Sequence, residues 1–239
     1  MNALFERKRL FGHRGDSEHH TENTLAAFEA CIESGIDGIE LDVQRTACGT
    51  LVVFHDFTLR RMALIDRRID EAEWEELKEI PIAGGERIPT LEAVFASIGT
   101  NLIYDIELKA RGIADTGLEE GVIKAIEKAG LTDHVLVSSF NPVLLRRFKR
   151  LASNRIPTAL IYSHSPEVPA VLRNGQGRLV ARPTLLKPEH TLAHAALKRG
   201  APLLPWTVDD EGVADQLLQA GAQGIISNRP TALAHLFRG

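Results

Sequence analysis

The chain lacks several features that would place it in particular classes of protein. Only two cysteines, Cys31 and Cys48, occur among 239 residues, which is too few for a disulfide framework or a structural zinc site. No apolar run approaches the ~18 residues of a membrane-spanning helix, and the first residues lack the apolar stretch of a signal peptide. We therefore expect two free thiols in a cytoplasmic protein that makes no stable association with a membrane.

Charge of one sign is not in large excess either. The formal net charge is -4, and no basic run is present. Proteins that bind nucleic acid neutralise phosphates with clustered Lys and Arg side chains, so we expect no nucleic-acid partner. An anionic small molecule would have to be bound by a few well-placed cationic side chains.

The apolar content is high enough for one large core. Hydrophobic residues make up 44% of the 239 residues, and α/β barrels of this length commonly form one domain. We expect residues 1–239 to form a single domain.

Strand and helix signals alternate along this length. Strand signals lie at 10–13, 38–43, 102–108, 135–138, 158–162, 179–181, 203–208 and 224–227. Helical signals lie at 25–32, 91–98, 118–129, 142–151, 167–173, 189–198, 212–220 and 231–237. Eight parallel strands interleaved with helices predict a (β/α)8 TIM barrel, an α/β fold. The alternative, an open doubly wound sheet, would call for a glycine-rich phosphate loop that this sequence lacks.

One part of the chain departs from this alternation. Residues 46–50 are too few for a crossover helix, so the apolar run at 51–55 is expected to return antiparallel beside the second strand. The charged stretch that follows, at about 57–88, has only a weak helical signal around 71–79. It is expected to be a short insertion after the second strand and its hairpin return.

Acidic side chains gather on two of the predicted strands. Glu40 and Asp42 share one face of their strand, and Asp105 and Glu107 share one face of the next. Carboxylates that close favour a cation between them, and oxygen ligands suit Mg²⁺ or Ca²⁺. A solvated strand face is the alternative for the first pair. Lys109 lies on the same face as Glu107, where it could serve a ligand or form an internal ion pair with Asp105.

Two of the nine histidines stand where a barrel would open to solvent. His13 and His55 each end an apolar run, and Arg14 and Asp56 follow them. Imidazoles titrate near neutrality, so a pair can act as general base and general acid in displacement at phosphorus. Metal ligation is the alternative, but imidazole prefers softer metals than carboxylates do. The seven other histidines lie in predicted loops or helices without clustered acids.

Short motifs are spread over nearly the whole chain: His13-Arg14-Gly15, Glu22-Asn23-Thr24-Leu25-Ala26-Ala27-Phe28, Gly38-Ile39-Glu40-Leu41-Asp42-Val43, His55-Asp56, Gly85-Glu86-Arg87-Ile88-Pro89-Thr90-Leu91, Glu107-Leu108-Lys109, Ser138-Ser139-Phe140, Trp206-Thr207-Val208 and Gly224-Ile225-Ile226-Ser227-Asn228-Arg229-Pro230. In order and spacing, these motifs resemble those of the glycerophosphodiester phosphodiesterase family. The combination is far more specific than any single motif.

The resemblance implies a TIM barrel that hydrolyses glycerophosphodiesters, which are deacylated phospholipids, to glycerol 3-phosphate and an alcohol. It implies one divalent cation, Mg²⁺ or Ca²⁺ with Mn²⁺ as a further candidate, and a small-molecule substrate. The implied roles are acid–base catalysis by His13 and His55, metal ligation by Glu40, Asp42 and Glu107, and phosphate contacts from Arg14 and Lys109. Trp206 is either a core residue or a wall for the glycerol or the headgroup.

The sequence also departs from the family pattern in places. Thr21 replaces the usual proline before the Glu-Asn-Thr run, Cys48 replaces an acidic turn residue, and Asp105 stands where an uncharged polar residue is common. Two other functions remain as alternatives. A related barrel phospholipase acting on membrane lipids would predict an exposed aromatic or apolar loop, yet aromatic residues make up only 5% of the chain. A non-catalytic metabolite-binding barrel would not need both histidines and all three carboxylates.

Overall fold

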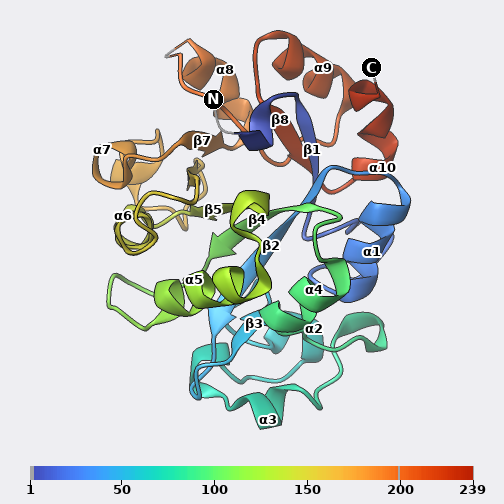
Figure 1. The fold of residues 1–239 in the computed structure, drawn as a ribbon, viewed down its shortest axis with the longest axis vertical. Coiled ribbons are helices and arrows are strands. Elements are labelled where there is room, and N and C mark those ends of the chain that lie inside the picture. The colour runs from blue at the N-terminus through green and yellow to red at the C-terminus, as the bar shows by residue number, and fades with distance from the viewer. Residues whose placement is uncertain (1–2, 199, 239) are drawn as a thin grey trace.

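The computed structural model describes residues 3–198 and 200–238, and its parallel strands curl into a sheet ringed by helices (Figure 1). The strands are β1 Arg9–His13, β2 Gly38–Arg45, β3 Leu51–Val53, β4 Ile103–Leu108, β5 Val135–Ser139, β6 Thr158–Tyr162, β7 Leu185–Pro188 and β8 Gly224–Ser227. They pair in the order β7-β6-β5-β4-β2-β1-β8, all parallel, and β3 pairs antiparallel with the end of β2. The expected hairpin return is therefore present.

An extended segment at 203–208 closes the sheet into a TIM barrel. On one side, the Leu204 and Trp206 amides donate to carbonyls of β7 at 2.9 and 3.0 Å. On the other side, the Val208 amide donates to Ile226 of β8 at 2.9 Å. Residues 203–208 were expected to be a strand, and they do occupy the seventh strand position. The ladder is nevertheless irregular, because Pro202 and Pro205 have no N–H to donate.

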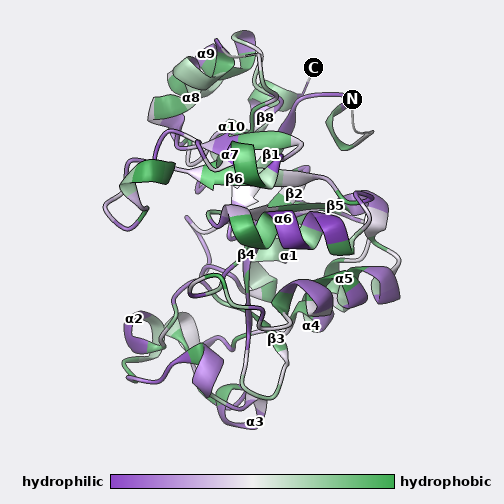
Figure 2. Cartoon of the chain, turned by 90° about the vertical axis from the view of Figure 1, so that its left-hand side faces the viewer, coloured by the Kyte–Doolittle hydropathy of each residue, from purple (hydrophilic) through white to green (hydrophobic). Residues whose placement is uncertain are grey.

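The helices cover the outside of this barrel. They are α1 Leu25–Glu33, α2 Arg60–Ala63, α3 Trp74–Leu77, α4 Leu91–Ile98, α5 Leu118–Ala129, α6 Pro142–Leu151, α7 Arg178–Ala181, α8 His190–Leu197, α9 Glu211–Gln219 and α10 Pro230–Leu233. Figure 2 shows hydrophobic and hydrophilic residues alternating along α5 and α6, as expected for helices with one face on the sheet. No helix in the described part of the chain is long and apolar enough to cross a membrane.

Two predicted elements between β6 and β8 are wrong. The apolar run at 179–181 is not a strand but part of the single-turn helix α7, with Leu179 73% exposed. The strand lies a few residues later, at Leu185–Pro188, where a lysine and a proline weaken the strand signal. The helix expected at 167–173 is only a 3-10 turn, Ala170–Leu172, which follows Pro169.

The segment between β3 and α4 has a small core of its own. It contains α2, α3 and two 3-10 turns, and Figure 1 shows it at the bottom of the view, apart from the helices around the barrel. Leu59, Ile69 and Leu77 are fully buried there and pack toward Val52 and Phe54. These contacts attach the segment to β3 and to the residue that follows it.

The interior of the barrel is apolar at one end. Inward-facing side chains near the N-terminal ends of the strands form one buried cluster: Phe11, Ile103, Leu136, Ala159, Leu185, Leu204 and Ile226. Leu4 and Phe5, from a 3-10 turn that precedes β1, join this cluster and close that end. Gly38 makes room for it, since a Cβ there would lie 2.5 Å from the Phe11 ring. The opposite end is therefore the one open to solvent.

Candidate active site

Polar side chains replace apolar ones toward the C-terminal ends of the strands. Because side chains of a strand alternate, positions two residues after the apolar cluster also face inward. They include His13, Glu40, Asp105, Ser138, Lys187 and Trp206. Asp42 and Glu107 follow one step further along β2 and β4. A cavity of about 760 Å³ opens here, lined by both charged and apolar residues. This is the face of a TIM barrel where active sites lie.

The three carboxylates that the resemblance assigns to a metal converge in this cavity. Each of Glu40, Asp42 and Glu107 offers an oxygen atom that lies within 4.8 Å of the corresponding atoms of the other two. All three side chains are buried. The convergence follows from register, since Asp42 and Glu107 are partners on the neighbouring strands β2 and β4.

Two residues with left-handed backbone conformations hold Asp42 in place. Arg14 and Asn23 have φ angles of 58° and 59°, which cost non-glycine residues on the order of 1 kcal/mol each. The Asn23 amide donates to Asp42 Oδ2 at 2.8 Å and accepts from the Asp42 backbone N–H at 3.2 Å. The Arg14 guanidinium lies 3.4 Å from the same carboxylate. Both strained residues lie in the one connection between β1 and α1, where it contacts the carboxylates.

The surroundings shift the acidities of these carboxylic acids in different directions. Burial raises the pKa of Glu40 to about 7, with Asp42 and Asp105 adding to the rise and Lys187 opposing it. Burial also raises the pKa of Glu107, against the effect of Lys109. For Asp42, burial opposes ionisation, but Lys109 and Arg14 hold the pKa well below its usual range. Close, buried carboxylates of this kind are unfavourable unless positive charge joins them.

This donor set fits a hard divalent cation. Three carboxylates supply oxygen ligands, which Mg²⁺, Ca²⁺ and Mn²⁺ prefer. Asp42 Oδ1 is buried and accepts no hydrogen bond of good geometry from the described residues, although Lys109 Nζ lies 3.4 Å away, so this oxygen can still serve a cation. The described residues supply no thiolate to this set, and the nearest histidine, His13, has its Nε2 atom 3.9 Å from Glu40.

Two ammonium groups stand beside the carboxylates. Lys109 Nζ lies 3.4 Å from Asp42 Oδ1 and 3.5 Å from Glu107 Oε1. The internal ion pair considered between Lys109 and Asp105 is not formed. Asp105 pairs instead with Lys187, whose Nζ lies 2.8 Å from Asp105 Oδ2. Lys109 therefore stays at the cavity wall, while Lys187 is buried beneath the carboxylates.

The hydrogen bonds around His13 determine which of its nitrogens carries a proton. His13 Nδ1 lies 2.6 Å from Asn228 Oδ1. The amide nitrogen of Asn228 donates to Asp209 at 2.7 Å, so its oxygen must face His13. An amide oxygen only accepts, and His13 Nδ1 is therefore the donor. Burial and the Arg14 charge lower the pKa of His13 to about 4. His13 is thus neutral near pH 7, with an unprotonated Nε2 on the side of Glu40.

His55 has a charged partner instead. Its Nδ1 lies 2.6 Å from Asp56 Oδ1. Arg61, from the segment between β3 and α4, donates to the other oxygen of Asp56 at 2.6 Å and also to Glu22. Burial works against ionisation of Asp56, but hydrogen bonds from Arg61 and His55 hold its pKa below the usual range. An ionised carboxylate can only accept, so His55 Nδ1 is the donor in this hydrogen bond.

Trp206 forms part of the wall between the charged and apolar sides of the cavity. Its ring lies 6.4 Å from that of His13 and packs edge to face on Phe140 at 5.6 Å. Its indole N–H donates to the Lys187 carbonyl at 3.0 Å. The side chain is only partly buried, so a face of the ring remains available to a ligand.

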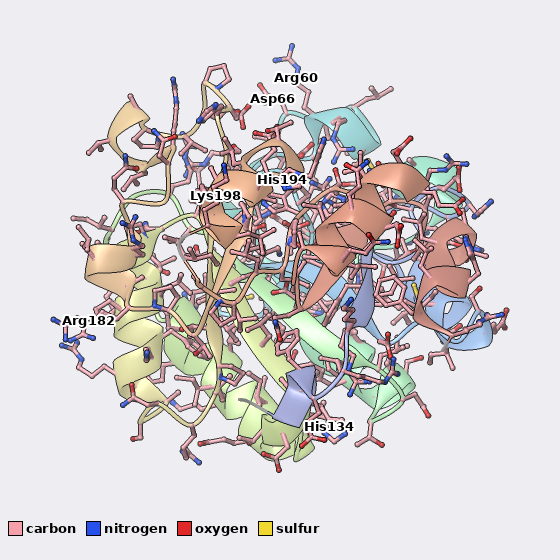
Figure 3. The ribbon with its side chains drawn as sticks, turned by 90° about the horizontal axis from the view of Figure 1, so that it is seen from above. Arg60, Asp66, His134, Arg182, His194 and Lys198 are labelled. Carbon is pink, nitrogen blue, oxygen red and sulfur yellow. The ribbon has the colours of Figure 1, made fainter. Side chains whose placement is uncertain are left out.

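The structure brings all eight predicted site residues to one end of the barrel, and seven of them line the cavity, with Asp42 just below its wall. The other histidines do not line it; Figure 3 shows His134, for example, at the edge of the molecule. The sequence alone did not assign four other residues to the site: Lys187, Asn228, Asp209 and Arg61. A lysine within the apolar run 185–188 was the available signal for Lys187.

Comparison with known proteins places this geometry in a family. Residues 13–232 match the model of the glycerophosphoryl diester phosphodiesterase family. A glycerophosphodiester phosphodiesterase from Caldanaerobacter subterraneus is 36% identical over 96% of this chain and 97% of its own length.

Solved structures agree in fold. A phosphodiesterase from Oleispira antarctica in complex with the product sn-glycerol-3-phosphate superposes with a TM-score of 0.78 at 25% identity, over 97% of each chain. A putative glycerophosphodiester phosphodiesterase from Galdieria sulphuraria superposes with a TM-score of 0.82 at 24% identity, over 98% of each chain. The chain therefore belongs to the glycerophosphoryl diester phosphodiesterase family of enzymes.

Proposed function

We propose that the protein hydrolyses glycerophosphodiesters to glycerol 3-phosphate and an alcohol, with the help of one divalent cation. The observation that carries the proposal is the convergence of three buried carboxylates in a cavity that two histidines also line. The relative from Oleispira antarctica, which binds sn-glycerol-3-phosphate, supports this class of substrate.

Glu40, Asp42 and Glu107 are the residues that would hold the cation. A bound Mg²⁺, Ca²⁺ or Mn²⁺ would supply Lewis-acid stabilisation of the negative charge that develops on the phosphoryl oxygens. Arg14 and Lys109 bind the phosphodiester anion from the two sides of Asp42, which both already approach at 3.4 Å. Trp206 provides a flat surface for the glycerol or the headgroup, and Phe140 holds its ring in place.

The two histidines divide the proton transfers between them. His13, with a neutral amide as its partner, accepts at Nε2 the proton of the attacking oxygen. His55, with the ionised Asp56 as its partner, donates a proton to the alkoxide that leaves when the P–O bond breaks. Each turnover thus moves one proton onto His13 and one from His55, and solvent restores both. The different partners of the two imidazoles support this order of roles.

A panel of glycerophosphodiesters tests the proposal. Glycerophosphocholine, glycerophosphoethanolamine and glycerophosphoglycerol are incubated with the protein and Mg²⁺, Mn²⁺ or Ca²⁺, and glycerol 3-phosphate is measured by a coupled assay. We expect release from at least one substrate and its loss in EDTA. No release from any substrate with any of the three cations would overturn the proposal and leave a binding function.

A further inference from the structure

A lysine among the residues that line the cavity is almost completely buried beside the carboxylates. Lys187 is 2% exposed, and its Nζ is 2.8 Å from Asp105 Oδ2, 3.3 Å from Ser138 Oγ and 3.5 Å from Glu40 Oε1. Ser138 also donates to the other oxygen of Asp105 at 2.7 Å. The ammonium thus has oxygen atoms on three sides, contributed by β2, β4 and β5.

The burial of the Lys187–Asp105 ion pair inside the barrel requires an explanation. Burying an ion pair usually stabilises a protein no more than an apolar pair of the same size would. The next layer of this barrel is indeed filled by apolar side chains. The Lys187–Asp105 pair is therefore poorly explained as a device for stability alone.

The register of the sheet indicates what this buried ion pair does. Glu40 and Asp105 are direct partners on the parallel strands β2 and β4, so their carboxylates stand side by side. Lys187 reaches them through the barrel interior from β7, which is separated from β4 by β5 and β6. Its ammonium contacts both carboxylates. It offsets the repulsion between Glu40 and Asp105 and also contacts Glu40 Oε1 directly, so a variant that lacks both charges of the Lys187–Asp105 pair still loses the contact with Glu40.

Glu40 is in fact held at both oxygens. Lys187 contacts Oε1, and the Arg14 backbone N–H donates to Oε2 at 3.2 Å. We propose that Lys187, anchored by Asp105 and Ser138, is a positioning residue that fixes the Glu40 carboxylate for cation binding. The inference rests on the proposed function only in that Glu40 is a cation ligand. Lys109, which lines the cavity, remains the lysine proposed to bind phosphate.

The test replaces the pair as a unit. Lys187→Met alone would leave the buried Asp105 carboxylate without a cationic partner and threaten folding. Asp105→Asn/Lys187→Met removes one charge of each sign, so the net charge around the cation site is unchanged, and the amide oxygen can still accept from Ser138. Loss of a group that orients a metal ligand typically weakens metal affinity about 10-fold to 100-fold.

We expect the double variant to bind Mn²⁺ with a Kd at least about 10-fold higher than wild type in calorimetric titration. In the glycerophosphodiester assay, the Mn²⁺ concentration for half-maximal rate should rise in parallel, and kcat at saturating Mn²⁺ should be retained. Should this variant not fold, Asp105→Asn/Lys187→Gln keeps a polar amide at the same depth and gives the same comparison.

A second ion pair, with a buried carboxylate and a partly buried guanidinium, provides a control. Arg147 donates to Glu119, which is 1% exposed, at 2.7 Å, and neither side chain contacts the carboxylate cluster. Glu119→Gln/Arg147→Met should lower the melting temperature but leave the Mn²⁺ Kd at its wild-type value.

The outcomes are distinguishable. A wild-type Mn²⁺ Kd in the Lys187 double variant would overturn the inference. A fall in kcat that saturating Mn²⁺ does not restore would overturn it too, because Lys187 would then act on the substrate. Weakened Mn²⁺ binding in a protein whose wild type hydrolyses no diester would overturn the proposed function and leave the positioning role standing.

Discussion

At the scale of single residues, the partners of the two histidines decide their chemistry. His13 faces the amide oxygen of Asn228, whereas His55 faces the carboxylate of Asp56. Burial and the nearby Arg14 charge lower the pKa of His13 to about 4, so His13 is uncharged near pH 7. Two histidines that look equivalent in sequence thus have different partners, an amide in one case and a carboxylate in the other.

Removal of either imidazole should stop proton transfer without emptying the cation site. His13→Ala and His55→Ala should each lower kcat by roughly 10²–10⁴-fold, since general acid–base catalysis contributes about this much. Mn²⁺ Kd, measured by titration calorimetry, should stay near the wild-type value because neither histidine is a ligand. A histidine variant whose activity returns with excess Mn²⁺ would instead identify that histidine as a ligand.

The acidic limb of the pH–rate profile should report His13. Below its pKa of about 4 the imidazole is protonated and cannot accept a proton, so kcat/KM should fall as pH drops through this value. Asn228→Asp would place a carboxylate beside the imidazolium and raise the pKa. The acidic limb should then move to higher pH while the alkaline limb stays. An unmoved acidic limb, measured at saturating Mn²⁺, would exclude His13 as the base.

Alternation along strands made part of this site predictable. Glu40, Asp42 and Glu107 follow from two strands whose register places their carboxyl ends together. Lys187 could not be found in the same way, because the strand that carries it was placed at 179–181. The contacts of Asn228 with His13 span 215 residues of sequence and depend on the closed barrel.

At the scale of elements, helices with clear end signals were predictable to within about a residue. Examples are α4 and α6, where Thr90 and Asn141 accept hydrogen bonds from the first turn. The stretch between the end of β6 and the end of β7 was not, because prolines interrupt both its helical and its strand signals. Residues 203–208 form an extended barrel position with hydrogen bonds on both sides, although Pro202 and Pro205 break the ladder.

The segment between β3 and α4 should depend on its own small core. Leu77 is fully buried in that core, so Leu77→Ala should lower the free energy of unfolding by about 2–5 kcal/mol. Leu64, in the same segment, is 91% exposed, and Leu64→Ala should change it by less than about 0.5 kcal/mol. Urea unfolding measures both. Equal effects of the two substitutions would show that this core is not formed.

At the scale of the whole molecule, the charge cluster at one end of the barrel opposes folding in the absence of a cation. The pKa of Glu40 is raised to about 7 in the folded protein, above the usual 4.5. The folded state therefore holds a proton on Glu40 between these two values that the unfolded state has lost. The stability that this proton contributes is fully present below pH 4.5 and is lost as pH rises through 7.

Glu40→Gln should accordingly stabilise the cation-free protein at pH 8. The gain should be on the order of 1–3 kcal/mol in EDTA and should vanish near pH 4, where wild-type Glu40 is protonated in both states. With Mn²⁺ at about 1,000 times its Kd, wild type gains about 4.1 kcal/mol from binding, and the order of stability should reverse. Melting temperatures at both pH values give the answer. A variant less stable than wild type in EDTA at pH 8 would contradict this account.

A crystal structure of the protein grown with Mn²⁺ and glycerol 3-phosphate would locate the cation by its anomalous scattering. We expect one strong peak at about 2.0–2.6 Å from oxygens of Glu40, Asp42 and Glu107. We also expect the phosphate within hydrogen-bond reach of Arg14 and Lys109, and between His13 and His55. A cation bound through either histidine, or at a site without these carboxylates, would contradict this arrangement.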